Sequence, residues 1–258
     1  MSVPVLETRD LTIRFGGHVA VNAVSTGFRA GELTAIVGPN GAGKTTYFNL
    51  ISGQLPATSG QIFLDGEEIT ALPPSARAQK GIGRAFQITS LFPNLTVHEN
   101  VRLAVQARSR HAASLTRLWS SHREWIERAE RALEEVNLHN QRDTLAAALP
   151  HGDKRKLEVA IMMALEPRVF MFDEPTAGMS VDEVPVILDL IAKLKARGDK
   201  TILLVEHKMD VVRSLADRII VLLNGTLSAD GDPAEVTASA AVQEAYLGVA
   251  PKRGAAHG

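Results

Sequence analysis

The chain has 258 residues, 45% of them hydrophobic, and a formal net charge of −1 at pH 7. This length allows one large domain or a core with a subdomain, the near-neutral charge gives no general sign of nucleic-acid binding, and the lack of cysteine excludes disulfides and thiolate chemistry. No apolar run approaches the roughly 20 residues that span a bilayer, and the N-terminus lacks a signal-peptide pattern. We therefore expect other chains to supply any membrane part.

The first third of the chain is strand-like. Residues 6–15 and 18–28 follow strand patterns, and the pair Asp65-Gly66 separates two further short runs, as is typical of a hairpin. Residues 33–37 form a short apolar run near glycines. These patterns predict an antiparallel sheet that leads into a buried strand.

The motif GPNGAGKTT follows that strand and precedes a predicted helix at 44–53, so it matches G-x-x-x-x-G-K-[ST] in both sequence and context. Glycines let successive backbone N–H groups curl around a phosphate, and the helix N-terminus adds positive charge. We predict that Lys44 reaches the β- and γ-phosphates and that Thr45 offers its hydroxyl to Mg²⁺. The predicted phosphate-contacting residues are Gly38, Pro39, Asn40, Gly41, Ala42, Gly43, Lys44, Thr45 and Thr46.

The middle of the chain is predicted to be helical, from about Val97 to Leu138. Residues 149–158, LPHGDKRKLE, then place a glycine and a basic run at the start of an amphipathic segment, as in a second phosphate-reading loop. Because the chain already has a better phosphate loop, the residues alone leave open what this segment binds.

Two acidic residues follow a second buried strand in VFMFDEP. We predict that Asp173 holds Mg²⁺ through its water shell and that Glu174 polarises the attacking water. The alternative, in which the two carboxylates only cap the next helix, is disfavoured by the phosphate loop.

Two further polar residues follow predicted strands. His207 comes just after TILLV, where it is predicted to hydrogen-bond the γ-phosphate, and Gln87 ends GRAFQ, where it is predicted to contact Mg²⁺ and the attacking water. The alternation of strands and helices, with a turn at Asn224-Gly225, predicts an α/β fold with right-handed crossovers.

In this order the motifs resemble those of the ATP-binding subunits of ABC transporters, over nearly the whole chain. The resemblance implies that ATP and Mg²⁺ are bound, that Phe15 stacks on adenine, and that Gln87 lies in the loop that links the core to a helical subdomain and to the membrane subunits. It also implies that 149–153 is the family signature, which reads the γ-phosphate bound by a partner subunit, and that Ala177–Ser180 is the dimer-contact loop. The signature residues carried over are Leu149, His151, Gly152 and Asp153.

This signature departs from the family's usual Leu-Ser-Gly-Gly-Gln. Pro150 replaces the serine, His151 the first glycine and Asp153 the amide, while Ser180 stands where many members have aspartate. A hydroxyl donor to phosphate is lost and a negative charge is added, so we predict that the partner's ATP site hydrolyses more weakly than the site of this chain.

The fold implied is a P-loop NTPase core with a mixed sheet, an N-terminal antiparallel β subdomain and an inserted α-helical subdomain. The chain is then a single ABC ATPase domain: residues 1–87 and 168–248 are the catalytic core, about 88–167 the helical subdomain, and 249–258 a flexible tail.

The segments FGGHVAV, GIGRAFQITSLFPNLTVHENV, LPHGDKRKLE and LLVEHKMD together look like the ATPase of branched-chain amino acid importers. That likeness implies a second ABC ATPase subunit, in a hetero- or homodimer, and two membrane permeases as partners. It also implies a periplasmic or extracellular solute-binding protein that acts indirectly, and no nucleic acid. The chain would then lie peripherally on the cytoplasmic face of the inner membrane.

The alternatives are the ATPase of a urea or amide importer or of a lipopolysaccharide exporter, a soluble ABC protein that meets no membrane, and an unrelated P-loop kinase. The soluble class usually carries two ATP-binding units in one chain, and this chain has one phosphate loop. A kinase would leave Gln87, the signature and His207 unexplained.

Overall fold

The computed structural model describes residues 3–85, 91–108 and 123–239. The chain folds as two compact units: Met1–Ala71 with Leu203–Gly258 forms the first, and Leu72–Ile202 the second. The predicted α/β fold with an antiparallel sheet is confirmed.

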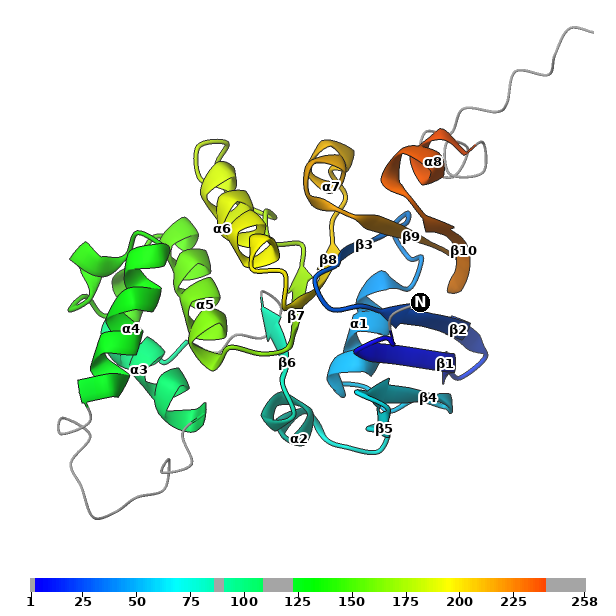
Figure 1. Cartoon of the computed structure of the whole chain (residues 1–258), viewed down its shortest axis with the longest axis horizontal. Helices are drawn as coiled ribbons and strands as arrows, with labels where there is room; N and C mark the ends of the chain where they lie inside the picture. Colours follow the sequence, from blue (N-terminus) through cyan, green and yellow to red (C-terminus); the bar gives the residue numbers. More distant parts are fainter. Residues whose placement is uncertain (1–2, 86–90, 109–122, 240–258) are drawn as a thin grey trace, which may run out of the picture. The chain divides into compact units, whose positions relative to one another are not determined.

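An antiparallel sheet occupies the N-terminal part of the first unit, as expected from the strand patterns (Figure 1). Leu6 faces Phe28 on one neighbouring strand and Leu64 on the other, and all three side chains are buried. The sheet has the order β2-β1-β4-β5, with strands β1 (Leu6–Phe15), β2 (His18–Phe28), β4 (Ser59–Leu64) and β5 (Glu67–Glu68).

The first unit also contains a mixed set of strands in the order β10-β9-β3-β8. The strands are β3 (Leu33–Val37), β8 (Thr201–Val205), β9 (Arg218–Leu223) and β10 (Thr226–Gly231). β3 and β9 pair in parallel, whereas β9 and β10 form the predicted hairpin, with Asn224 and Gly225 both at positive φ. The helices are α1 (Lys44–Ser52), α7 (Met209–Leu215) and α8 (Pro233–Ala238).

One arginine ties the two sheets of the first unit together. Arg218 on β9 donates to the Gly27 carbonyl at 2.6 Å and to the Thr26 hydroxyl at 3.1 Å, both on β2. It also forms an ion pair with Asp230 on β10 at 2.6 Å. Because the guanidinium is planar and has donors on several edges, it can hold three strands at once.

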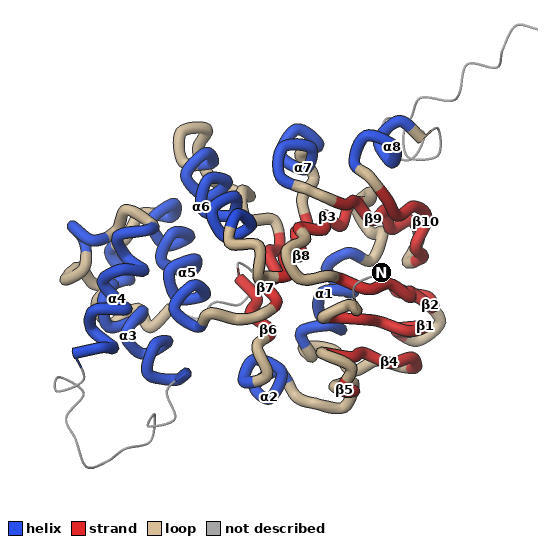
Figure 2. The backbone as a smooth tube through the Cα atoms, viewed as in Figure 1, coloured by secondary structure: helices blue, strands red, loops and turns tan. Residues whose placement is uncertain are grey.

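The second unit contains a helical group that Figure 2 shows side by side: α3 (Val97–Arg108), α4 (Arg123–Glu135) and α5 (His151–Leu165). Its short parallel strands β6 (Ile82–Ala85) and β7 (Val169–Asp173) pair from Ile82↔Val169 to Ala85↔Phe172. The remaining helices are α2 (Pro74–Gln79), α6 (Val184–Ala196) and two 3₁₀ turns at His139–Gln141 and Ala146–Ala148.

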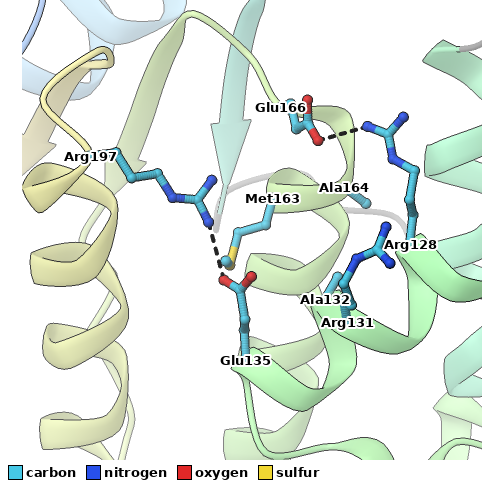
Figure 3. A pocket seen from close by; sticks show the side chains of 8 residues that line it. All are labelled: Arg128, Arg131, Ala132, Glu135, Met163, Ala164, Glu166 and Arg197. Atoms are coloured by element: carbon cyan, nitrogen blue, oxygen red, sulfur yellow. Dashed lines mark hydrogen bonds and ion pairs between the residues drawn. The ribbon is translucent and has the colours of Figure 1, made fainter.

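A cavity of about 90 Å³ lies at the ends of α4, α5 and α6 (Figure 3). Glu166 follows α5 with a φ of 42° and pairs with Arg128 at 2.7 Å and with Arg108, while Arg197 pairs with Glu135 at 3.3 Å. Since the cavity is walled by these ion pairs and contains no predicted site residue, we assign it no part in the site.

Candidate functional site

The phosphate loop lies between β3 and α1, as predicted. Gly43 is the residue before α1, in the left-handed region at φ 95°, so the helix begins at Lys44 and its first turn carries the Thr45 and Thr46 hydroxyls. A Cβ on Gly43 would collide with the Ala20 carbonyl oxygen, and one on Gly38 would collide with the Leu222 carbonyl oxygen. These positions therefore need glycine for close backbone approach as well as for conformation.

Lys44 is almost fully buried and folds back over the loop. Its Nζ donates to the carbonyl of Gly38 at 2.7 Å and to that of Pro39 at 3.0 Å. The loop is supported from behind, where the Gly225 N–H donates to the Ala42 carbonyl at 3.1 Å. The ammonium is thus held within the loop that the motif predicts to take phosphates.

Two other predicted ligand contacts belong to the first unit. Phe15 ends β1 and is 49% exposed, an unusual position for a large aromatic residue and one where it could stack on a ligand. His207 is exposed directly after β8, the strand next to β3.

Glu206 shapes the turn that carries His207, and sequence reasoning missed it. Its carboxylate is buried and accepts the backbone N–H of His207 at 2.9 Å and that of Lys208 at 3.3 Å. A buried acid that caps two N–H groups fixes the direction in which the chain leaves β8. The acid beside the histidine in VEH was the available signal.

The two predicted acids belong to the second unit, at the end of β7. Asp173 is buried and forms an ion pair with Arg84 of β6 at 2.8 Å. Glu174 is half-buried and has a φ of 52°, a left-handed conformation that glutamate rarely adopts. Backbone strain of this kind concentrates at functional sites.

The signature segment opens α5. Pro150 is the residue before the helix, which begins at His151, so the missing proline N–H removes no helix bond. Leu149 and Gly152 are buried and His151 is exposed. The loop Ala177–Ser180, which is predicted to contact a partner subunit, lies beside it, since a Cβ on Gly178 would be 3.6 Å from His151 Cε1.

The carboxylate of Asp153 forms its hydrogen bonds with residues of the second unit. Its carboxylate accepts Lys156 Nζ at 2.7 Å and Gln141 Nε2 at 3.0 Å. Burial raises the pKa of Asp153, but these hydrogen bonds outweigh burial and the net shift is downward. The extra negative charge noted in the sequence is therefore largely balanced by Lys156.

Glu183 is a second residue that the sequence did not reveal. Its carboxylate lies against Gly152 and accepts the Ser180 N–H at 3.0 Å and the Ser180 hydroxyl at 2.9 Å.

Gln87, predicted to contact Mg²⁺ and water, lies outside the described residues.

Comparison with known proteins identifies the family. Residues 21–177 match the ABC transporter family, and residues 229–251 match the family described as branched-chain amino acid ATP-binding cassette transporter. The chain therefore belongs to the ABC transporter family. The fold of its ATPases binds nucleotide, and ATP hydrolysis is the general activity of that family.

Individual relatives match almost from end to end. The high-affinity branched-chain amino acid transport ATP-binding protein BraF of Pseudomonas aeruginosa is 43% identical, with 97% of this chain and 100% of the relative covered. The corresponding LivG of Escherichia coli K12 is 38% identical at the same coverage. The crystal structure of MJ1267 in its ADP conformation, an ATP-binding cassette of an ABC transporter, is 29% identical with a TM-score of 0.82, covering 96% of this chain and 100% of that one.

Proposed function

We propose that this chain is the ATP-binding and ATP-hydrolysing subunit that powers uptake of branched-chain amino acids by an ABC importer. The observation that carries the proposal is the 43% identity to BraF over 97% of the chain. The lipopolysaccharide export ATP-binding protein LptB of Haemophilus influenzae is also related, but at 33% identity. No described helix has both the length and the apolarity to cross a bilayer.

Nucleotide binding is assigned to the first unit. The backbone N–H groups of the loop Gly38–Thr46, other than at Pro39, surround the phosphates. Lys44 moves its ammonium from the loop carbonyls to the β- and γ-phosphates, and Phe15 stacks on adenine. An exposed aromatic ring and a lysine held inside a glycine-rich loop support these roles.

Mg²⁺ fits the oxygen donors that the motifs provide. The metal is usually held by one or two protein oxygens together with phosphates and waters, not by a cage of side chains. The described residues contain no cluster of three or more His, Asp or Glu suited to a metal. We assign Thr45, Asp173 and Gln87 as the protein contacts. When bound, Mg²⁺ would offset the negative charge of the phosphates.

Hydrolysis is assigned to residues that position water and phosphate. Glu174 orients and polarises the attacking water, His207 hydrogen-bonds the γ-phosphate, Gln87 contacts the same water, and Lys44 offsets developing charge. Phosphoryl transfer depends mainly on positioning and electrostatics, so a strained acid and a histidine held by Glu206 suit the task.

The remaining parts serve assembly. We propose that a second ABC ATPase subunit closes over the nucleotide and that Leu149, His151, Gly152 and Asp153 of this chain read the nucleotide of that partner. Closure of the two ATPase subunits is passed to two permeases in the membrane through a helical subdomain at about 88–167, which is inserted in a core of 1–87 and 168–248. A solute-binding protein delivers the transported solute. The chain then sits on the cytoplasmic face of the inner membrane, and the predicted tail at 249–258 lies outside the described residues.

Uptake of labelled leucine by the assembled complex in proteoliposomes tests this function. ATP enclosed on the same side of the membrane as the ATP-binding subunits is expected to drive uptake. Lys44→Ala is expected to abolish this uptake, whereas Lys193→Ala, a change at an exposed lysine of α6, is expected to leave it intact. Transport of urea in place of leucine, or extraction of lipopolysaccharide, would assign the chain to one of the alternative systems.

A further inference from the structure

The carboxylate of Glu183 covers the start of α5. A Cβ added to Gly152, the second residue of that helix, would collide with the carboxyl group of Glu183, and the glycine is buried. Because Gly152 has no side chain, a carboxylate of its own chain can lie at the start of α5. This is the helix end that is assigned to the γ-phosphate of the partner's ATP. An ionised carboxylate and a phosphate are attracted to a helix N-terminus for the same reason, the positive end of its dipole and its unpaired N–H groups.

Ser180 holds this carboxylate in place. Its backbone N–H and its hydroxyl both donate to Glu183 Oε2, at 3.0 and 2.9 Å. The hydrogen bond from the Ser180 N–H, and then that from its hydroxyl, lower the pKa of Glu183 despite a small opposing effect of burial, so the group is an anion at neutral pH. Aspartate at position 180, as in many family members, would face Glu183 with a like charge.

Two charged side chains of α5 act on the carboxylate of Glu183. Lys156 lies close enough to favour its ionised form, and Asp153 close enough to oppose it. Yet Lys156 and Asp153 are paired with each other at 2.7 Å, and Asp153 also accepts Gln141. The pair is nearly neutral as a whole, whereas the two hydrogen bonds that Glu183 accepts from Ser180 come from neutral groups.

We infer that Glu183 is a positioning residue that controls how the signature segment receives the partner's ATP. In the separate subunit its carboxylate takes the place of the γ-phosphate at Gly152, and it must swing away before two subunits close on nucleotide. The inference rests on the proposed function. The competing explanation is purely local: Ser180 and Glu183 have the spacing of a capping box before α6, and would then serve only to begin that helix.

ATP-dependent turnover of the assembled transporter distinguishes the two. Glu183→Gln removes the charge, so it is expected to lower the KM for ATP roughly three- to tenfold while kcat stays within about twofold. Ser180→Ala removes one of two donors and is expected to move KM in the same direction by less. Binding of a fluorescent ATP analogue by the isolated chain is expected to be unchanged in both, because neither Ser180 nor Glu183 is assigned a contact with the nucleotide of its own chain.

Glu99→Gln is the matched control. Glu99 stands three residues after Thr96, whose hydroxyl accepts the Glu99 N–H at 3.1 Å, so it also belongs to a capping-box sequence, at the start of α3. This variant is expected to keep the wild-type KM. Equal KM values for Glu183→Gln and wild type, with both proteins folded by circular dichroism, would overturn the inference. Wild-type complex without ATPase activity would instead overturn the proposed function.

Discussion

Arg84 and Asp173 form an ion pair at 2.8 Å, with 10% and 3% of their side chains exposed. The pair joins two adjacent parallel strands of the second unit and holds the carboxylate that is assigned to Mg²⁺. Arg84, which lies outside the acidic motif, therefore helps to orient this acid before any ligand arrives.

Arg84→Met is expected to lower the free energy of unfolding by about 3–5 kcal/mol, because it removes the arginine that pairs with the buried carboxylate of Asp173. The double change Arg84→Met with Asp173→Asn is expected to cost clearly less. Urea unfolding without nucleotide measures both, with Arg131→Met, at an exposed residue of α4, as the control. If the single and double variants lose equal stability, the pair does not couple as described.

Lys44→Ala is expected to weaken ATP binding by about 3 kcal/mol, roughly 100-fold, because charge-assisted hydrogen bonds to the phosphates are lost. Isothermal titration with ATP gives the dissociation constant. In the wild type the ammonium leaves two loop carbonyls to reach the ligand, so the loss is smaller than for a wholly unpaired lysine. Unchanged affinity would remove Lys44 from the phosphate site.

Gly43→Ala and Gly41→Ala separate crowding from conformation. Both glycines have positive φ, 95° and 81°, so each alanine costs about 1–2 kcal/mol of backbone energy. Only Gly43 faces a backbone carbonyl, that of Ala20, whereas a Cβ on Gly41 meets open space. Thermal unfolding is expected to show Gly43→Ala less stable than Gly41→Ala by about 1–3 kcal/mol. Equal losses would contradict the close approach of β2 to the loop.

Glu174→Gln is expected to lower the kcat for ATP at least roughly 100-fold while ATP still binds. Glutamine has nearly the same size as glutamate, so the substitution should leave the local backbone unchanged. ATP would then bind without being hydrolysed, and the ATP-bound subunit pair should accumulate. Size-exclusion chromatography with ATP checks this, with Glu134→Gln on the exposed side of α4 as the control. Normal turnover in Glu174→Gln would mean that another group activates the water.

Phe15→Ala is expected to weaken binding of adenine nucleotides roughly tenfold, about 1.4 kcal/mol, since aromatic stacking on a base contributes on that order. Inorganic triphosphate, which has no base, should bind equally well before and after the change. Phe92, an exposed phenylalanine of the second unit, gives the matched substitution. A similar loss in Phe92→Ala would show that Phe15 has no specific role.

The sequence predicted the strands better than the short helices. β1, β2, β3 and β8 were placed with their observed bounds, because alternation and buried apolar runs are strong local patterns. The helices α2, α7 and α8, of six or seven residues, were missed because they are too short to show a clear periodicity. α6 begins at Val184, one residue before a proline, since Pro185 is tolerated in a first turn.

The site divides in the same way. The phosphate loop and the acids after β7 could be recognised because their residues are adjacent in the chain. Arg84 and Glu183 could not, since each acts on a residue that is distant in sequence, 89 positions away for Arg84 and Asp173. Only folding brings such pairs together. In the sequence, neither Arg84 nor Glu183 belongs to a pattern that would mark it as functional.

Arg218 has a consequence for ligand choice. By tying β2 to β9 and β10 it makes the sheet that ends in Phe15 and the strands that carry the phosphate loop one rigid frame. The span between the base-stacking ring and the glycine loop is then set in advance. With Phe15 on adenine and the phosphates in the glycine loop, as proposed, a nucleotide has to match that span to make both contacts.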